Sequence, residues 1–125
     1  MNAIYELLNL NNKVIIVYPI PEVGVNVMNK LFWNRHFYFD KDRNLKKYLT
    51  TDYQVFLTRT KKTFEIFDSI NHSNLERVFL HKLFCDNTIS NRYITHDNNY
   101  IYYKDDDHPS KKGSELINNL ILKKL

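Results

Sequence analysis

The chain has 125 residues, of which 43% are hydrophobic and 26% are charged, and its formal net charge is +4. This is the size of one modest domain, and the composition is ordinary for a soluble globular protein, which argues against a disordered or fibrous chain. No apolar run approaches the ~20 residues of a transmembrane helix, and the N-terminus lacks a signal peptide's basic and apolar regions. The chain as written is therefore expected to stay in the cytoplasm.

The excess of basic residues does not predict a nucleic-acid surface. Lysines occur as scattered pairs at positions 46–47, 61–62, 111–112 and 123–124, and an acidic triplet at 105–107 interrupts them. Such a pattern is typical of a solvated surface, so no nucleic-acid partner is expected. The single cysteine, Cys85, excludes an internal disulfide framework.

The first third of the chain predicts a helix, a strand and a second helix. Residues 2–10 carry an apolar helical face, and Val14–Tyr18 is a β-branched apolar run, typical of a parallel strand buried on both faces. Two prolines end this strand, so residues 19–24 form a loop where ligands bind in open α/β sheets. Residues 26–33 are expected to form a helix and residues 35–44 a loop.

The strongest helix is predicted over residues 51–70, with Thr51 or Asp52 as its N-cap. Residues 77–80 predict a second strand. The helix stripe expected in the core consists of Val55, Phe56, Phe64, Phe67 and Ile70.

The last third predicts an extended segment at residues 100–103 and a helix over residues 110–122, with Pro109 in its first turn. Its apolar stripe is Leu116, Ile117, Leu120 and Ile121. Strands that alternate with helices favour an α/β fold with a parallel sheet.

The turn before the last helix carries the residues best suited to chemistry. Asp105 precedes His108 by three positions. A carboxylate so placed can accept the Nδ1–H of the imidazole, fix its tautomer and leave Nε2 to act as a general base. The same residues also suit a purely structural acidic cap over the start of a helix.

Three motifs, in order, resemble the SGNH domain that is fused to membrane acyltransferases of the acyltransferase 3 family. They are Val-Ile-Ile-Val-Tyr-Pro-Ile-Pro-Glu-Val-Gly at 14–24, Phe-Leu-Thr-Arg-Thr at 56–60 with Leu-Phe-Cys at 83–85, and Tyr-Tyr-Lys-Asp-Asp-Asp-His-Pro-Ser-Lys-Lys-Gly at 102–113. The last resembles the family's closing Asp-x-x-His block. The resemblance covers nearly all of the chain but only about the C-terminal half of the family domain.

This resemblance implies a single partial domain over residues 1–125, an incomplete three-layer α/β/α sandwich of the SGNH, flavodoxin-like kind. It implies that Asp105 is the orienting acid, with Asp106 as the alternative, and that His108 is the general base. The implied activity is hydrolysis or transfer of acyl esters on a cell-surface polysaccharide, at the extracytoplasmic face of the membrane. The implied partners are the carbohydrate ester, an N-terminal half and a membrane acyltransferase domain. No metal or organic cofactor is implied.

The chain departs from the family pattern in its nucleophile. No serine follows a Gly-Asp pair, and the earlier blocks that complete the family's oxyanion hole are missing. Arg92 is followed by Tyr93, where the family often has the partner cysteine of Cys85. Two alternatives therefore stand beside an active half-domain: an inactive remnant or split half that acts as an interaction module, and a basic module that binds polyanions.

Two other polar residues have open roles in the sequence. Glu22 either lines the site or caps a turn. Arg59 is expected in an ion pair rather than in catalysis, and Cys85 is expected to be a packed thiol because no activating base is near it in sequence.

Overall fold

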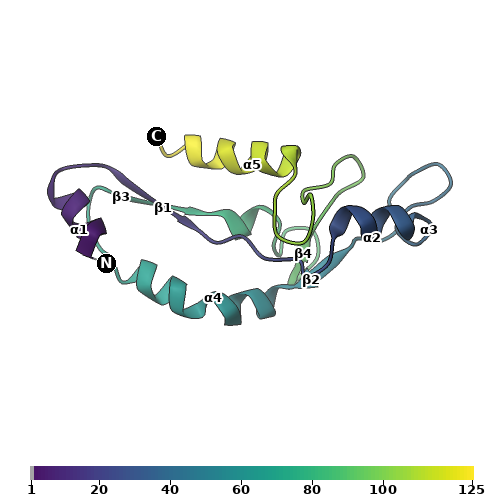
Figure 1. Cartoon of the computed structure of the whole chain (residues 1–125), viewed down its shortest axis with the longest axis horizontal. Helices are drawn as coiled ribbons and strands as arrows, with labels where there is room; N and C mark the ends of the chain where they lie inside the picture. Colours follow the sequence, from purple (N-terminus) through teal and green to yellow (C-terminus); the bar gives the residue numbers. More distant parts are fainter. Residues whose placement is uncertain (1) are drawn as a thin grey trace.

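The computed structural model describes residues 2–125 of the chain, and for residue 2 it describes the backbone only. Helices flank a central pair of strands, and a smaller pair of strands lies beside them (Figure 1). In chain order the elements are α1 (Asn2–Asn9), β1 (Val14–Tyr18), α2 (Val27–Trp33), α3 (Arg35–Tyr38), β2 (Thr50–Asp52), α4 (Tyr53–Asp68), β3 (Leu75–Phe79), the 3-10 helix η1 (Leu80–Leu83), β4 (Arg92–Ile94) and α5 (Lys111–Leu122).

The central strands β1 and β3 are parallel, and their register runs from Val14 opposite Leu75 to Tyr18 opposite Phe79. Helix α4 is the last element of the connection between them and lies on one side of the pair, while α5 lies on the other (Figure 1). This confirms the predicted α/β class with a parallel sheet. The three layers are present but thin, because the sheet has two strands in the part of the chain that the structure describes.

The two faces of β1 are not equally covered. Ile16 and Tyr18 are buried, and they pack with Phe64 and Phe67 of α4. Val17 points to the other face and is 38% exposed. The prediction of a strand buried on both faces is therefore wrong for the side opposite α4, because α5 does not fully cover that side.

A second core surrounds the small antiparallel sheet of β2 and β4, which was not predicted from the sequence. Thr50 pairs with Ile94 and Asp52 with Arg92. The buried residues of this core come from segments that are far apart in the sequence: Val23, Val27, Leu31, Tyr38, Phe84, Cys85, Tyr93, Ile94, Tyr102 and Tyr103. It therefore packs the loop after β1 against the segment that carries Asp105 and His108.

Most predicted helices form with adjusted ends. Helix α4 begins at Tyr53 because Asp52 caps it by accepting the Gln54 N–H at 2.8 Å. Val55 is half exposed rather than in the core. Helix α5 begins at Lys111, so Pro109 lies just ahead of the cap residue and not inside the first turn.

The predicted loop at residues 35–44 contains the short helix α3, and the second strand begins at Leu75 rather than at residue 77. In residues 100–103, Ile101 and Tyr103 form isolated bridges to His96 and Pro109. Within residues 2–125, none of the helices combines the length and the apolar character needed to cross a bilayer.

Candidate functional site

Two loops that are far apart in sequence meet at the C-terminal end of β1. The N–H of Val23 donates to the carbonyl of Asp106 at 2.7 Å, and the N–H of Val27 donates to the carbonyl of Asp105 at 3.2 Å. The loop after β1 is the edge at which parallel α/β sheets bind ligands. The Asp105–His108 turn is therefore attached to this edge by backbone hydrogen bonds.

The carboxylate of Asp105 and the ring of His108 face each other. Nδ1 of His108 lies 3.0 Å from Oδ2 and 3.1 Å from Oδ1 of Asp105. The same carboxylate accepts the backbone N–H of His108 at 2.8 Å and that of Asp107 at 3.2 Å. The turn thus holds the carboxylate at the Nδ1 side of the ring, which leaves Nε2 as the position that can accept a proton.

The electrostatics of Asp105 follow from these contacts. The backbone N–H of His108 is the largest cause that lowers the pKa of Asp105, and the Asp107 N–H and the His108 ring add to it, so that the pKa falls to about 2. A carboxylate that accepts several N–H donors is stabilised in its charged form. Asp105 is therefore ionised at neutral pH, as an orienting acid must be.

Asp107 is a second carboxylate near the ring, with its Oδ1 2.8 Å from Nδ1 of His108. Asp106, the alternative acid, contributes its carbonyl oxygen to Val23 instead. The geometry therefore favours Asp105 over Asp106 as the ring's partner. Asp105, Asp107 and His108 offer ligand atoms within 4.8 Å of one another, but exposed acidic groups often cluster without a metal ion. The expectation of a site without a metal stays a prediction.

Close packing holds the Asp105–His108 turn at both ends. Ser110 caps α5 by accepting the Gly113 N–H at 3.1 Å, and its hydroxyl donates to Ile101 O at 2.6 Å. Gly113 is required because a Cβ there would lie 2.2 Å from the carbonyl oxygen of Tyr102. Helix α5 therefore packs directly on the backbone three residues before Asp105.

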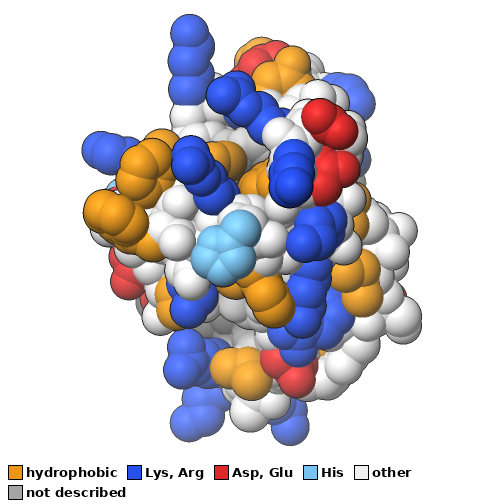
Figure 2. All heavy atoms as spheres, turned by 90° about the vertical axis from the view of Figure 1, so that its right-hand side faces the viewer, with side chains coloured by type: hydrophobic (Ala, Val, Ile, Leu, Met, Phe, Trp, Pro, Cys, Tyr) orange, Lys and Arg blue, Asp and Glu red, His pale blue; other side chains and the backbone are white. Residues whose placement is uncertain are grey.

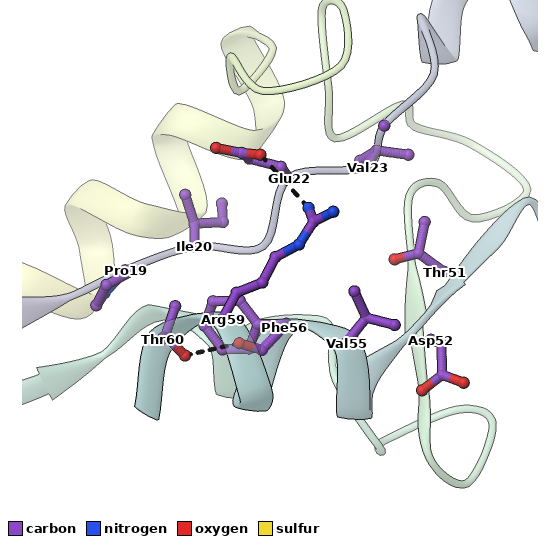
Figure 3. A pocket seen from close by; sticks show the side chains of 11 residues that line it. Pro19, Ile20, Glu22, Val23, Thr51, Asp52, Val55, Phe56, Arg59 and Thr60 are labelled. Carbon is purple, nitrogen blue, oxygen red and sulfur yellow. Dashed lines mark hydrogen bonds and ion pairs between the residues drawn. The ribbon is translucent and has the colours of Figure 1, made fainter. Parts of the chain in front are cut away.

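A cavity of about 410 Å³ lies between the loop after β1 and the first turns of α4. Glu22 and Arg59 lie across it from each other, with the guanidinium 3.8 Å from the carboxylate, and Phe56 and Val55 line its apolar side (Figure 3). Both charged side chains are largely exposed. Arg59 thus forms the expected ion pair, and Glu22 lines a cavity. Val55 was not predicted at this cavity, because its helical spacing placed it in the core stripe.

The described residues place no serine hydroxyl among the contacts of the His108 ring, whose partners are carboxylates. Cys85 is buried and unpaired, as expected. Burial, with a smaller contribution from Asp86, raises the pKa of its thiol to about 12, so it is not a thiolate at neutral pH.

A family model described as an SGNH domain fused to AT3 domains matches residues 1–123. The chain belongs to this family. Comparison with curated proteins and with solved structures gave no match. The match confirms the SGNH resemblance over nearly the whole chain.

As an SGNH domain, the chain is an esterase-like or acyltransferase-like module. The Asp105–His108 pair lies beside the loop that follows the parallel strand β1. The catalytic role of the pair stays a prediction, and so do the substrate and the single partial domain over residues 1–125.

Proposed function

We propose that this SGNH chain supplies the acid–base half of a site that hydrolyses or transfers acyl esters on a cell-surface polysaccharide. His108 is the general base, and Asp105 is its orienting carboxylate. The observation that carries the proposal is the contact between Nδ1 of His108 and both oxygens of Asp105. It supplies the ring orientation and the charge that a serine hydrolase needs from its His–Asp pair.

The chemistry assigned to the pair is proton transfer. A serine hydroxyl attacks the ester carbonyl and gives its proton to Nε2 of His108, and the imidazolium that forms is stabilised by the ionised Asp105. The imidazolium then returns the proton to the departing alcohol oxygen. Water or an acceptor hydroxyl next attacks the acyl-serine, with His108 again as the base.

Residues outside these 125 supply the serine and the oxyanion donors in this proposal, either from the same polypeptide or from a separate chain. Two observations support it. The His108 side chain is 71% exposed, so it is open to an approaching group. Strand β1 pairs on one edge with β3, and its other edge has no partner strand among the described residues, which fits the addition of a further strand.

The cavity between Glu22 and Arg59 is the place we assign to the sugar. Exposed charged side chains around an apolar floor can hydrogen-bond hydroxyl groups while an apolar face packs beneath them. The loop that carries Glu22 continues to Val23, which is bonded to Asp106. A ligand in the cavity would therefore lie beside the same loop that supports the Asp105–His108 turn.

The test uses a fluorophosphonate, which labels activated serines. The chain is mixed with an N-terminal SGNH half that carries a Gly-Asp-Ser block, and labelling is followed by mass for the unchanged chain and for the His108→Ala variant. We expect labelling of the supplied serine that requires His108. Asp105→Asn should reduce the rate of ester hydrolysis by roughly 10⁴-fold, which is the loss typical of an orienting carboxylate. Asp106→Asn should leave the rate of ester hydrolysis unchanged.

Labelling that is equal with and without His108 would show that another base activates the serine. Equal losses in Asp105→Asn and Asp106→Asn would contradict the assignment of the acid.

The second candidate is an interaction module without catalysis. It is favoured by the absence of a Gly-Asp-Ser block and by the incompletely covered face of β1. In that case the N-terminal half would bind the chain and improve its solubility, and ester hydrolysis would not appear. The catalytic proposal also includes an extracytoplasmic location of the chain and a link to a membrane acyltransferase domain.

A further inference from the structure

The end of the molecule formed by α2 and α3 exposes a group of large apolar side chains. Trp33 is 74% exposed and Phe32 is 64% exposed, and three more apolar side chains of this segment are at least 40% exposed. We call this surface the α2–α3 tip. Its apolar members are Val25, Met28, Phe32, Trp33 and Phe37.

Helix α2 is apolar on two sides. Val27 and Leu31, four positions apart, are buried in the core. Met28 and Phe32, also four positions apart, point outward instead. A helix covered on one side by protein normally presents polar residues on the other. The outward apolar side therefore needs a separate explanation, and packing within the described chain does not provide it.

One third of the chain's 18 basic residues lie in the segment that forms this surface. Residues 25–47 contain six basic and two acidic residues, a net charge of +4, which equals the net charge of the whole chain. Figure 2 views this end of the molecule and shows Lys and Arg side chains interspersed with hydrophobic ones. The basic members are Lys30, Arg35, Lys41, Arg43, Lys46 and Lys47, and all are exposed.

We infer that the α2–α3 tip docks on an anionic lipid bilayer surface. Tryptophan and phenylalanine side chains favour the interface between headgroups and acyl chains, and lysine and arginine are attracted to anionic headgroups. Protruding aliphatic side chains such as Met28 gain little from a sugar or a nucleic-acid base but are favourable in the acyl region. The charge and the apolar side chains are thus complementary to one partner. The inference does not depend on the catalytic proposal.

Trp33 is the sole tryptophan of the chain, so its fluorescence reports on this surface directly. The unchanged 125-residue chain is titrated with vesicles of phosphatidylcholine mixed with phosphatidylglycerol. We expect a blue shift of the emission and co-sedimentation of the chain, with weaker binding to pure phosphatidylcholine and at high salt. Phe32→Ser should weaken binding by roughly tenfold or more, because a large buried aromatic contributes at least that much.

Two further variants separate the alternatives. Lys46→Gln combined with Lys47→Gln should weaken binding to the anionic vesicles. Leu122→Ser removes a side chain of similar exposure, 60%, from α5 and should leave binding unchanged. Circular dichroism verifies that each variant is folded. The inference is overturned if the chain does not bind the vesicles, or if the Phe32→Ser and Leu122→Ser variants bind them with equal affinity. It is also overturned if soluble heparin produces the same blue shift of the Trp33 emission.

Discussion

The hydroxyl of Tyr103 donates a hydrogen bond to the carbonyl oxygen of Pro21 over 2.7 Å, although the two residues are 82 positions apart. Tyr103 is completely buried, and its hydroxyl also contacts that of Tyr93. This side chain therefore joins the loop after β1 to the segment that leads into Asp105. Both loops of the candidate site depend on the same buried hydroxyl group.

Replacing Tyr103 by phenylalanine should destabilise the fold. The Tyr103→Phe change keeps the ring but leaves the Pro21 carbonyl without this donor, which costs about 1–3 kcal/mol for a buried group. Urea unfolding measures the effect. Tyr100→Phe, at a half-exposed position, is the control and should change the free energy of unfolding by less than about 0.5 kcal/mol. Equal effects of the two changes would contradict a special role for the buried hydroxyl.

Gly113→Ala should also be destabilising, for a steric reason. The added Cβ would lie 2.2 Å from the carbonyl oxygen of Tyr102, which is backbone and cannot rotate away. Helix α5 must then shift, at a cost of about 1–3 kcal/mol, the usual range for overpacking. Alanine otherwise favours helices over glycine, so a gain in thermal stability would show that α5 does not pack this closely on Tyr102. Ser114→Ala, on the same helix, is the matched control.

The carboxyl group of Asp105 should titrate well below its usual value. Its pKa is lowered from 3.8 to about 2, chiefly by the backbone N–H of His108. Because the backbone contributes most, His108→Ala should retain most of this shift. A carbon-detected NMR titration of the unchanged chain and the variant measures both values. A return of the pKa to near 4 in His108→Ala would show that the ring, and not the turn, stabilises the charge.

Acid should weaken the fold through His81. This histidine is buried against Phe56 and Phe64, and its Nδ1 has no hydrogen-bond partner in the part of the chain that the structure describes. Burial, with a smaller contribution from Lys82, lowers its pKa from 6.5 to about 4. The unfolded ring takes up a proton below about pH 6.5, whereas the folded ring resists it until about pH 4. The free energy of unfolding should therefore fall as the pH drops through that window.

The His81→Phe variant tests this dependence, because phenylalanine fits the aromatic surroundings and does not titrate. Denaturant unfolding at a series of pH values should show a smaller loss of stability between about pH 6.5 and 4 than in the unchanged chain. Part of the loss should remain, since burial also lowers the pKa of His96. Identical pH profiles would show that His81 is not the group that resists protonation.

Local features of the chain could be predicted from the sequence because neighbouring residues determine them. The apolar run Val14–Tyr18 and the prolines after it define β1 to the residue. The spacing of Asp105 and His108 allows one turn to bring the carboxylate to the ring, and Ser110 supplies the cap that starts α5. These interactions span at most a few residues, so they can be predicted from the local sequence pattern.

Tertiary structure decided what depends on contacts between distant segments. Strands β2 and β4 are three residues each and carry too short a pattern to predict, and they form because they pair with each other. The bond from Val23 to Asp106 attaches the Asp105–His108 turn to the sheet edge. Helical spacing placed Val55 and the outward side of α2 among apolar positions, but periodicity alone does not reveal which apolar face finds a partner. The amino-acid sequence thus determined the individual helices, strands and turns and the chemistry of their side chains. Long-range packing determined which faces were covered and which loops met.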